Sequence, residues 1–130
     1  MERTIPYITL SGRILLALIF VTAGYSKIGG YDGTLQYMQA FNVPAFLLPL
    51  VIFAELGGGI ALIAGFLTRT AAAGLAIFSV VAAMIFHSNF ADQMQSILFM
   101  KNIAMAGGLL YIVAFGAGKF SVDDKLGLKF

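Results

Sequence analysis

The sequence predicts an all-α integral membrane protein, folded as a four transmembrane helix bundle. Of its 130 residues, 60% are hydrophobic and only 11% are charged. A soluble domain of this length needs far more charge to cover its surface. The mean hydropathy is +0.94. A spanning helix takes about 20 apolar residues, so this length accommodates four spans with short connections. We therefore expect residues 1–130 to form one transmembrane domain.

The composition also limits the chemistry that the chain can perform. It contains no cysteine, which excludes disulfides, thiol redox reactions, iron–sulfur clusters and thiolate metal sites. Its net charge of +2 is small and scattered along the chain, so nucleic acid is not an expected partner. The partner that this composition requires is the lipid bilayer.

The first predicted span covers residues 7–26. Arg13 lies several residues inside it, and the glycines at 29 and 30 are expected to end it, with Lys27 extending its ammonium group toward the interface. Basic residues followed by an apolar run also occur in signal peptides. We expect a retained span instead.

Residues 31–41 predict a short amphipathic helix between the first and second spans. Tyr31, Leu35, Met38 and Phe41 recur at helical spacing and would form its apolar face. Such a helix either rests at the membrane interface or packs against the bundle, and the sequence leaves both alternatives open.

The remaining spans are predicted at residues 45–67, 71–86 and 97–115. In the second span, Pro49 falls near the first turn, where a missing N–H is tolerated. Gly57, Ala61 and Gly65 then repeat every four residues. This small-residue stripe predicts close packing against another helix.

The distribution of basic residues predicts the orientation. With four spans, both termini and the turn at residues 68–70 lie on one side of the membrane. That side carries six basic residues and the other side carries two. Because basic loops favour the cytoplasm, we predict that both termini are cytoplasmic. The six residues are Arg3, Arg13, Arg69, Lys119, Lys125 and Lys129, and the two are Lys27 and Lys101.

The residue that most needs an explanation is Glu55, a carboxylate inside the second span. It lies roughly 14 Å from the start of that span at the rise of an α-helix. An ionised side chain at the bilayer centre costs about 2.5–3.5 kcal/mol on insertion scales, so Glu55 should be paired, hydrated or protonated. Arg13 is the expected partner because its guanidinium can bond a carboxylate bidentately, and Lys101 is the alternative. The pair either lines a cavity for a ligand or proton, or only fixes the register of the helices.

The other polar candidates gather toward the outer end of the predicted bundle. His87 is the only histidine, and it would act as a proton donor to a quinone-like ring or as an interfacial hydrogen-bonding residue. One histidine without a second strong ligand predicts no metal site. Lys27, Lys101 and Asn102 are expected near the same level as His87. We therefore predict a polar ligand pocket there, with no recognisable set of catalytic residues.

The same segments resemble the DoxX family. The similarity lies in RILLALIFVTAG at 13–24 with KIGGY at 27–31, in ELGGG at 55–59 with GFLTR at 65–69, and in HSNF at 87–90 with FMKN at 99–102. It covers nearly the whole chain and points to the small bacterial inner-membrane branch. The resemblance implies a four-helix bundle in a bacterial inner membrane and an association with redox enzymes, since the family name comes from a subunit of a thiosulfate:quinone oxidoreductase. It supplies no catalytic residues.

Two functional hypotheses follow. The first is a redox-associated subunit or module that binds a quinone-like amphipathic ligand, with quinone as its cofactor and a redox enzyme as its partner. The second is a non-enzymatic membrane scaffold that forms a homo-oligomer or binds a partner through its small-residue stripes. In neither case is the chain expected to be a complete enzyme on its own. A transporter would need a multimer, because four spans leave little room for alternating access.

Overall fold

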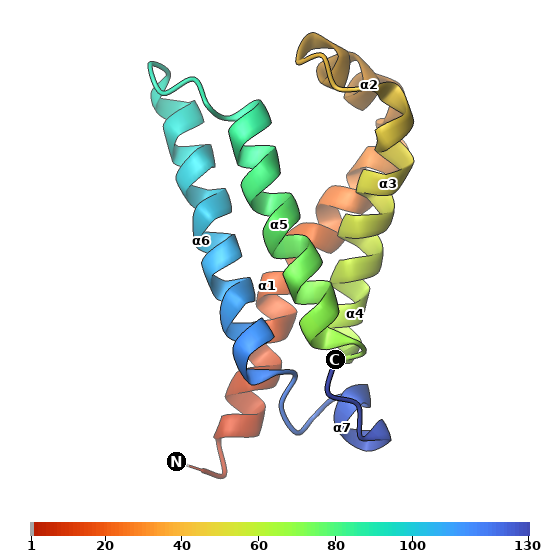
Figure 1. The fold of residues 1–130 in the computed structure, drawn as a ribbon, viewed down its shortest axis with the longest axis vertical. Coiled ribbons are helices and arrows are strands. Elements are labelled where there is room, and N and C mark those ends of the chain that lie inside the picture. The colour runs from red at the N-terminus through yellow and green to blue at the C-terminus, as the bar shows by residue number, and fades with distance from the viewer. Residues whose placement is uncertain (1) are drawn as a thin grey trace.

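The computed structural model describes residues 2–130, and within them it contains helices and no strands (Figure 1). Four helices are long and apolar enough to cross a membrane. They cover Ile5–Gly29, Ala45–Ala64, Thr68–Phe86 and Gln93–Phe115. The prediction of an all-α membrane bundle is confirmed.

The first span is helix α1 (Ile5–Gly29), and α2 (Tyr31–Ala40) follows it after a single residue. Proline in the first turn of α1 starts the helix earlier than residue 7, because its fixed φ suits that position. The amphipathic helix predicted at 31–41 is confirmed as α2. It packs on the bundle, since the rings of Tyr37 and Phe41 contact Phe86 at the end of the third span.

The second span is not one regular helix. It begins as a 3₁₀ turn, η1 (Ala45–Leu47), continues as α3 (Leu48–Ile52), widens into a π turn, η2 (Phe53–Gly57), and finishes as α4 (Gly58–Ala64). The helix ends three residues before the predicted boundary at 67, because Gly65 adopts a left-handed φ of 73°. The π turn contains Glu55.

The third and fourth spans are α5 (Thr68–Phe86) and α6 (Gln93–Phe115), and a short helix α7 (Val122–Leu126) closes the chain. Helix α6 starts four residues before the predicted residue 97, because the Asp92 carboxylate accepts from the backbone N–H of Met94 at 3.0 Å. It ends at Gly116, whose φ is 80°.

The spans are arranged as two helix pairs (Figure 1). We call α1 and the second span the first pair, and α5 and α6 the second pair. The contacts between helices are most extensive within these two pairs. The pairs approach each other at the end that carries both termini and diverge toward the end that carries α2. Ala17, Phe20, Leu62, Leu75 and Leu109 belong to the apolar core that joins them.

The close approaches between helices overlap only in part with the predicted Gly57, Ala61 and Gly65 stripe. A Cβ at Gly59 would lie 2.7 Å from Val21 Cγ2, and a Cβ at Gly24 would lie 2.9 Å from the backbone nitrogen of Leu56. A Cβ at Gly57 would meet only the ring of Phe53 in its own span, whereas a Cβ at Gly65, which ends the helix, would overlap Nη1 of Arg13 on α1. A close approach to another helix therefore occurs at Gly59 and Gly65 but not at Gly57, and the packing role of Ala61 stays a prediction.

Candidate functional site

A cavity of about 580 Å³ lies between the two helix pairs, in the half of the bundle nearer α2. Its walls come from α1, α2, the second span, α5 and α6, and most of them are apolar. The structure brings five of the predicted polar residues together in this lining and leaves Arg13 outside it. The five are Lys27, Glu55, His87, Lys101 and Asn102.

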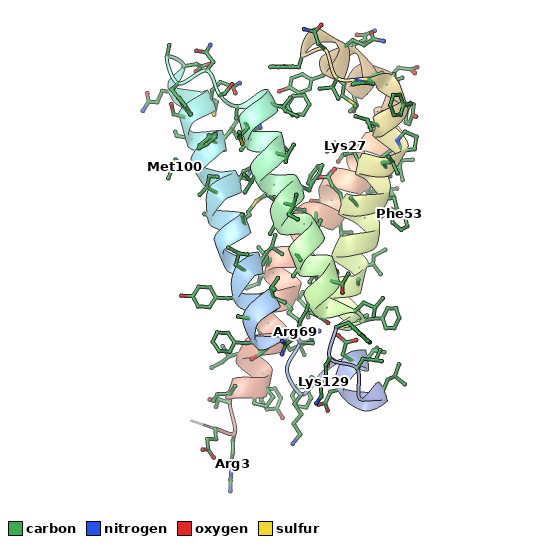
Figure 2. The ribbon with its side chains drawn as sticks, viewed as in Figure 1. Arg3, Lys27, Phe53, Arg69, Met100 and Lys129 are labelled. Atoms are coloured by element: carbon green, nitrogen blue, oxygen red, sulfur yellow. The ribbon has the colours of Figure 1, made fainter. Side chains whose placement is uncertain are left out.

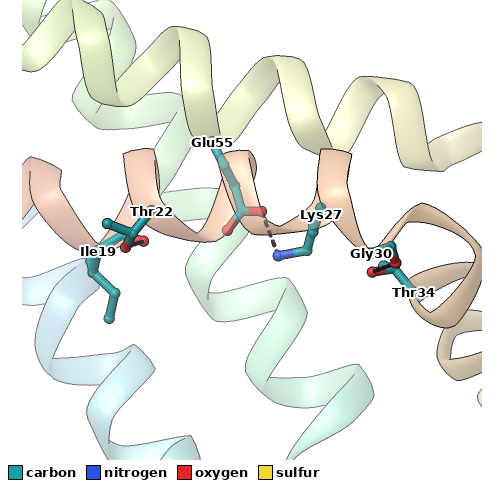
Figure 3. Close-up of polar contacts among 6 residues, drawn as sticks. All are labelled: Ile19, Thr22, Lys27, Gly30, Thr34 and Glu55. Carbon is teal, nitrogen blue, oxygen red and sulfur yellow. Dashed lines mark hydrogen bonds and ion pairs between the residues drawn. The ribbon is translucent and has the colours of Figure 1, made fainter.

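Glu55 projects from the π turn toward α1 (Figure 3). It is 5% exposed, and its Oε1 lies 2.6 Å from Nζ of Lys27. π turns of this kind often occur at functional sites. The ammonium group offsets the charge that burial would otherwise leave without compensation.

The expected pairing of Glu55 with Arg13 is therefore wrong. Arg13 donates through Nη1 to the carbonyl oxygen of Leu62 at 3.2 Å. Leu62 lies seven residues beyond Glu55, which corresponds to roughly 10 Å along a helix, so the two side chains lie at different depths. The prediction measured depth from the start of each span and could not include the offset between neighbouring helices.

Arg13 instead holds the C-terminal segment against the bundle. It is buried, and its Nη2 donates to the carbonyl oxygen of Phe120. Nearby, the Asp123 carboxylate caps α5 by accepting from the backbone N–H of Leu67 at 2.7 Å and from that of Thr68 at 2.9 Å. Through these hydrogen bonds Arg13 and Asp123 connect α1, the α4–α5 turn and α7. The three segments lie together at the end of the bundle opposite the cavity. Arg69 and Lys129 lie at this end, opposite Lys27 (Figure 2).

Asp123 is held in its charged form. Burial alone would raise the pKa of its carboxyl, but the hydrogen bonds from Thr68 and Leu67 and the attraction of Arg13 outweigh that effect. The pKa of Asp123 therefore lies below its ordinary value. No sequence pattern near Asp123 indicated this cap, because its partners lie more than fifty residues away along the chain.

The wall formed by α5 and α6 contains a hydroxyl group that the sequence analysis missed. Ser79 is 1% exposed, lines the cavity, and its Oγ has no hydrogen-bond partner among residues 2–130. Asn102 Nδ2 donates to the backbone carbonyl of Ser79 at 3.3 Å, which links α6 to α5. One signal was available, since Ser79 is the only polar side chain in the predicted span 71–86.

His87 and α2 form the outer end of the cavity. His87 Nδ1 lies 3.0 Å from Gln95 Oε1. Beside it, the rings of Tyr37, Phe41 and Phe86 contact one another with centroids 5.1 to 5.3 Å apart. Two rings of this aromatic cluster, Tyr37 and Phe86, line the cavity.

The arrangement is typical of a small-molecule site. Ligand cavities usually measure about 300–1,000 Å³ and have apolar walls with a few placed polar groups. This one offers the carboxylate–ammonium pair, the Ser79 hydroxyl, an amide and an imidazole. Among residues 2–130, no group of three or more histidine or acidic side chains is placed to hold a metal ion.

Comparisons with known proteins identify relatives along the whole chain. The DoxX family model matches residues 8–88. The Escherichia coli inner membrane protein YqjF is 51% identical over 120 residues, covering 92% of each chain. The E. coli inner membrane protein YphA is 33% identical over 92% of this chain and 91% of its own. CatD of Bacillus subtilis, described as a proposed oxidoreductase, is 32% identical over 53% of this chain and 52% of its own. No solved structure matches.

Proposed function

This chain belongs to the DoxX family of inner membrane proteins, and on that premise we propose that it binds a quinone-like amphipathic ligand between its helix pairs. The observation that carries the proposal is the 580 Å³ cavity, in which the Glu55–Lys27 pair and the Ser79 hydroxyl, unpartnered within residues 2–130, face apolar walls. Apolar walls suit the ring and tail of such a ligand, and the polar groups suit its oxygens.

The lining supplies the groups that a quinone ring needs. A quinone carries carbonyl oxygens that accept hydrogen bonds, and the Ser79 hydroxyl and the Lys101 ammonium can both donate. Phe20, Phe78 and Met105 provide flat or polarisable apolar surface for the ring. Reduction of a quinone to a quinol takes up two electrons and two protons. Glu55 and His87 are side chains in this lining that can hold a proton.

We propose further that the electrons come from a partner redox enzyme, so that this chain acts as an accessory subunit. The description of CatD as a proposed oxidoreductase supports this assignment. A second function, a scaffold that forms a homo-oligomer, is supported by glycines on the outer surface. A Cβ at Gly12, Gly74 or Gly107 would have no neighbour within 4 Å, which leaves room for a second helix.

We also propose that both termini face the cytoplasm. The two termini and the α4–α5 turn lie at the same end of the bundle (Figure 1), and that end holds six of the eight basic residues. In this orientation the cavity lies in the outer half of the membrane.

Native mass spectrometry of the protein released from its own membranes tests the proposed function. We expect a retained mass of quinone size that is lost in Glu55→Gln and in Ser79→Ala. The control is Asp124→Asn, an exposed residue at the opposite end of the bundle, which should retain the ligand. A ligand-free oligomer in all variants would favour the scaffold function and contradict ligand binding.

A further inference from the structure

The cavity reaches the outer surface of the bundle between α3 and α5. Leu50 and Val81 both line the cavity, yet they are 60% and 47% exposed on the outside. A side chain that lines a cavity and is also exposed marks the place where that cavity opens. We call this place the lateral opening, formed by Leu50 and Val51 on α3 and by Val81 and Ile85 on α5.

The helices leave this opening because they do not pack closely there. Helix α5 packs against the second span mainly through α4 and η2, below the opening. Leu50 and Val81 lie within spanning helices, so at this depth the opening faces hydrocarbon rather than water. All four of its side chains are aliphatic and offer no hydrogen bond to water or to a polar ligand.

At the aqueous end the cavity is bordered by aromatic rings, and Tyr37 there both lines the cavity and is 46% exposed. Helix α2 crosses that end, with Met38 buried beneath it and the Tyr37–Phe41–Phe86 ring cluster beside it. A ligand that arrived from water would pass these rings and the polar groups of Lys101 and His87. A ligand already dissolved in the outer leaflet would meet only aliphatic side chains.

Resting on the proposed function, we infer that the ligand enters sideways from the bilayer through the lateral opening and leaves its long apolar tail there. The occupant is an uncharged ring head on a polyisoprenoid or alkyl tail. The head fits the inner cavity, where Lys27 neutralises Glu55 and the Lys101 ammonium is left to donate to a carbonyl oxygen of the ring. The tail exceeds the remaining volume and lies between α3 and α5.

A quinone with a tail and the same quinone without one distinguish binding in the lateral opening from binding in the inner cavity. The protein is embedded in nanodiscs, and equilibrium binding is measured for decyl-ubiquinone and for the same ring without a tail. Val81→Trp fills the opening, and Leu50→Trp fills it from the other wall in case the first variant folds poorly. The matched control is Ile77→Trp, one turn away on α5, 67% exposed and outside the cavity lining. Circular dichroism confirms the helical content of each variant.

We expect each filling variant to weaken decyl-ubiquinone binding by about tenfold or more, with the tailless ring and the Ile77→Trp control unchanged. Equal binding of the tailed probe by Val81→Trp, Leu50→Trp and the wild type would overturn the placement of the tail in the lateral opening, and the inference with it, while leaving the proposed function intact. Failure of the wild type to bind either probe would overturn the proposed function and the entrance with it. Displacement of the tailed probe by added anionic phospholipid would show that the occupant is a membrane lipid and overturn the inference.

Discussion

Lys27 at the end of the first span and Glu55 in the middle of the second form an ion pair with 2.6 Å between Nζ and Oε1. The pair joins α1 to the π turn of the second span, and it forms part of the cavity lining. The π turn, the Glu55–Lys27 ion pair and the cavity therefore lie at the same place in the bundle.

Removing the cation from this pair should destabilise the protein. In Lys27→Met, Glu55 loses its partner in an apolar setting, and we expect a loss of about 1–3 kcal/mol in the free energy of unfolding. The double variant Lys27→Met with Glu55→Gln should recover part of that loss, because no charge is left unpaired. Reversible denaturation in detergent measures both. Additive losses in the double variant would contradict the pairing.

Ser79→Ala should have opposite effects on stability and on binding. The substitution removes a buried hydroxyl that has no partner in residues 2–130, so the free protein should become as stable or more stable, by up to about 1 kcal/mol. Affinity for a quinone should fall, because a donor to the ligand is lost. Thermal unfolding and a binding isotherm together check this, and a joint fall in stability and affinity would indicate a structural role instead.

The C-terminal cap should make stability depend on pH. Because the pKa of Asp123 is lower in the folded protein than in the unfolded chain, its carboxylate contributes stability at neutral pH. That contribution is lost as the pH falls through and below about pH 4. Hydrogen exchange at the start of α5, measured at several pH values, should show faster opening in acid. The Asp123→Asn variant should lose this dependence, whereas Asp124→Asn should retain it.

The glycine contacts predict a contrast between two alanine substitutions. Gly59→Ala places a Cβ 2.7 Å from Val21 Cγ2 and should cost about 1–3 kcal/mol through overpacking. Gly107→Ala meets nothing within 4 Å and should be neutral or slightly stabilising, because alanine favours the helix. Unfolding in detergent compares them, and equal stability of the two variants would contradict the packing of α1 against α4.

Much of the fold could be predicted from the sequence. In lipid each span has to satisfy the hydrogen bonds of its own backbone, so each one is a helix and appears in the sequence as a local run of apolar residues. Some helix boundaries were predicted wrongly because they depend on contacts with residues far away in the sequence. Helix α5 begins at Thr68 rather than residue 71 because Asp123 caps it from the other end of the chain. The early end of the second span depended on the left-handed φ of Gly65, which the sequence analysis assigned to a packing stripe.

Five of the six polar residues predicted for the site line one cavity, but Arg13 does not, and the partner of Glu55 was not predicted. Depth along each span placed Lys27, His87 and Lys101 near one level, and all three line the cavity. The partner of Glu55 could not be assigned in the same way, because the relative rotation and offset of α1 and the second span depend on the π turn and on the contact between Gly59 and Val21. Gln95 was missed as the partner of His87 because it lies on the next helix, across the loop.

Photoaffinity labelling tests the central claim most directly. An azido-quinone is bound to the protein in nanodiscs, illuminated, and mapped by peptide mass spectrometry. The account predicts labels on segments 19–27, 50–55 and 78–87, with the labels lost when excess unlabelled quinone is added. Labels spread over the outer surface, for example around Tyr111 and Phe115 of α6, and unaffected by competitor, would contradict a quinone site between the helix pairs.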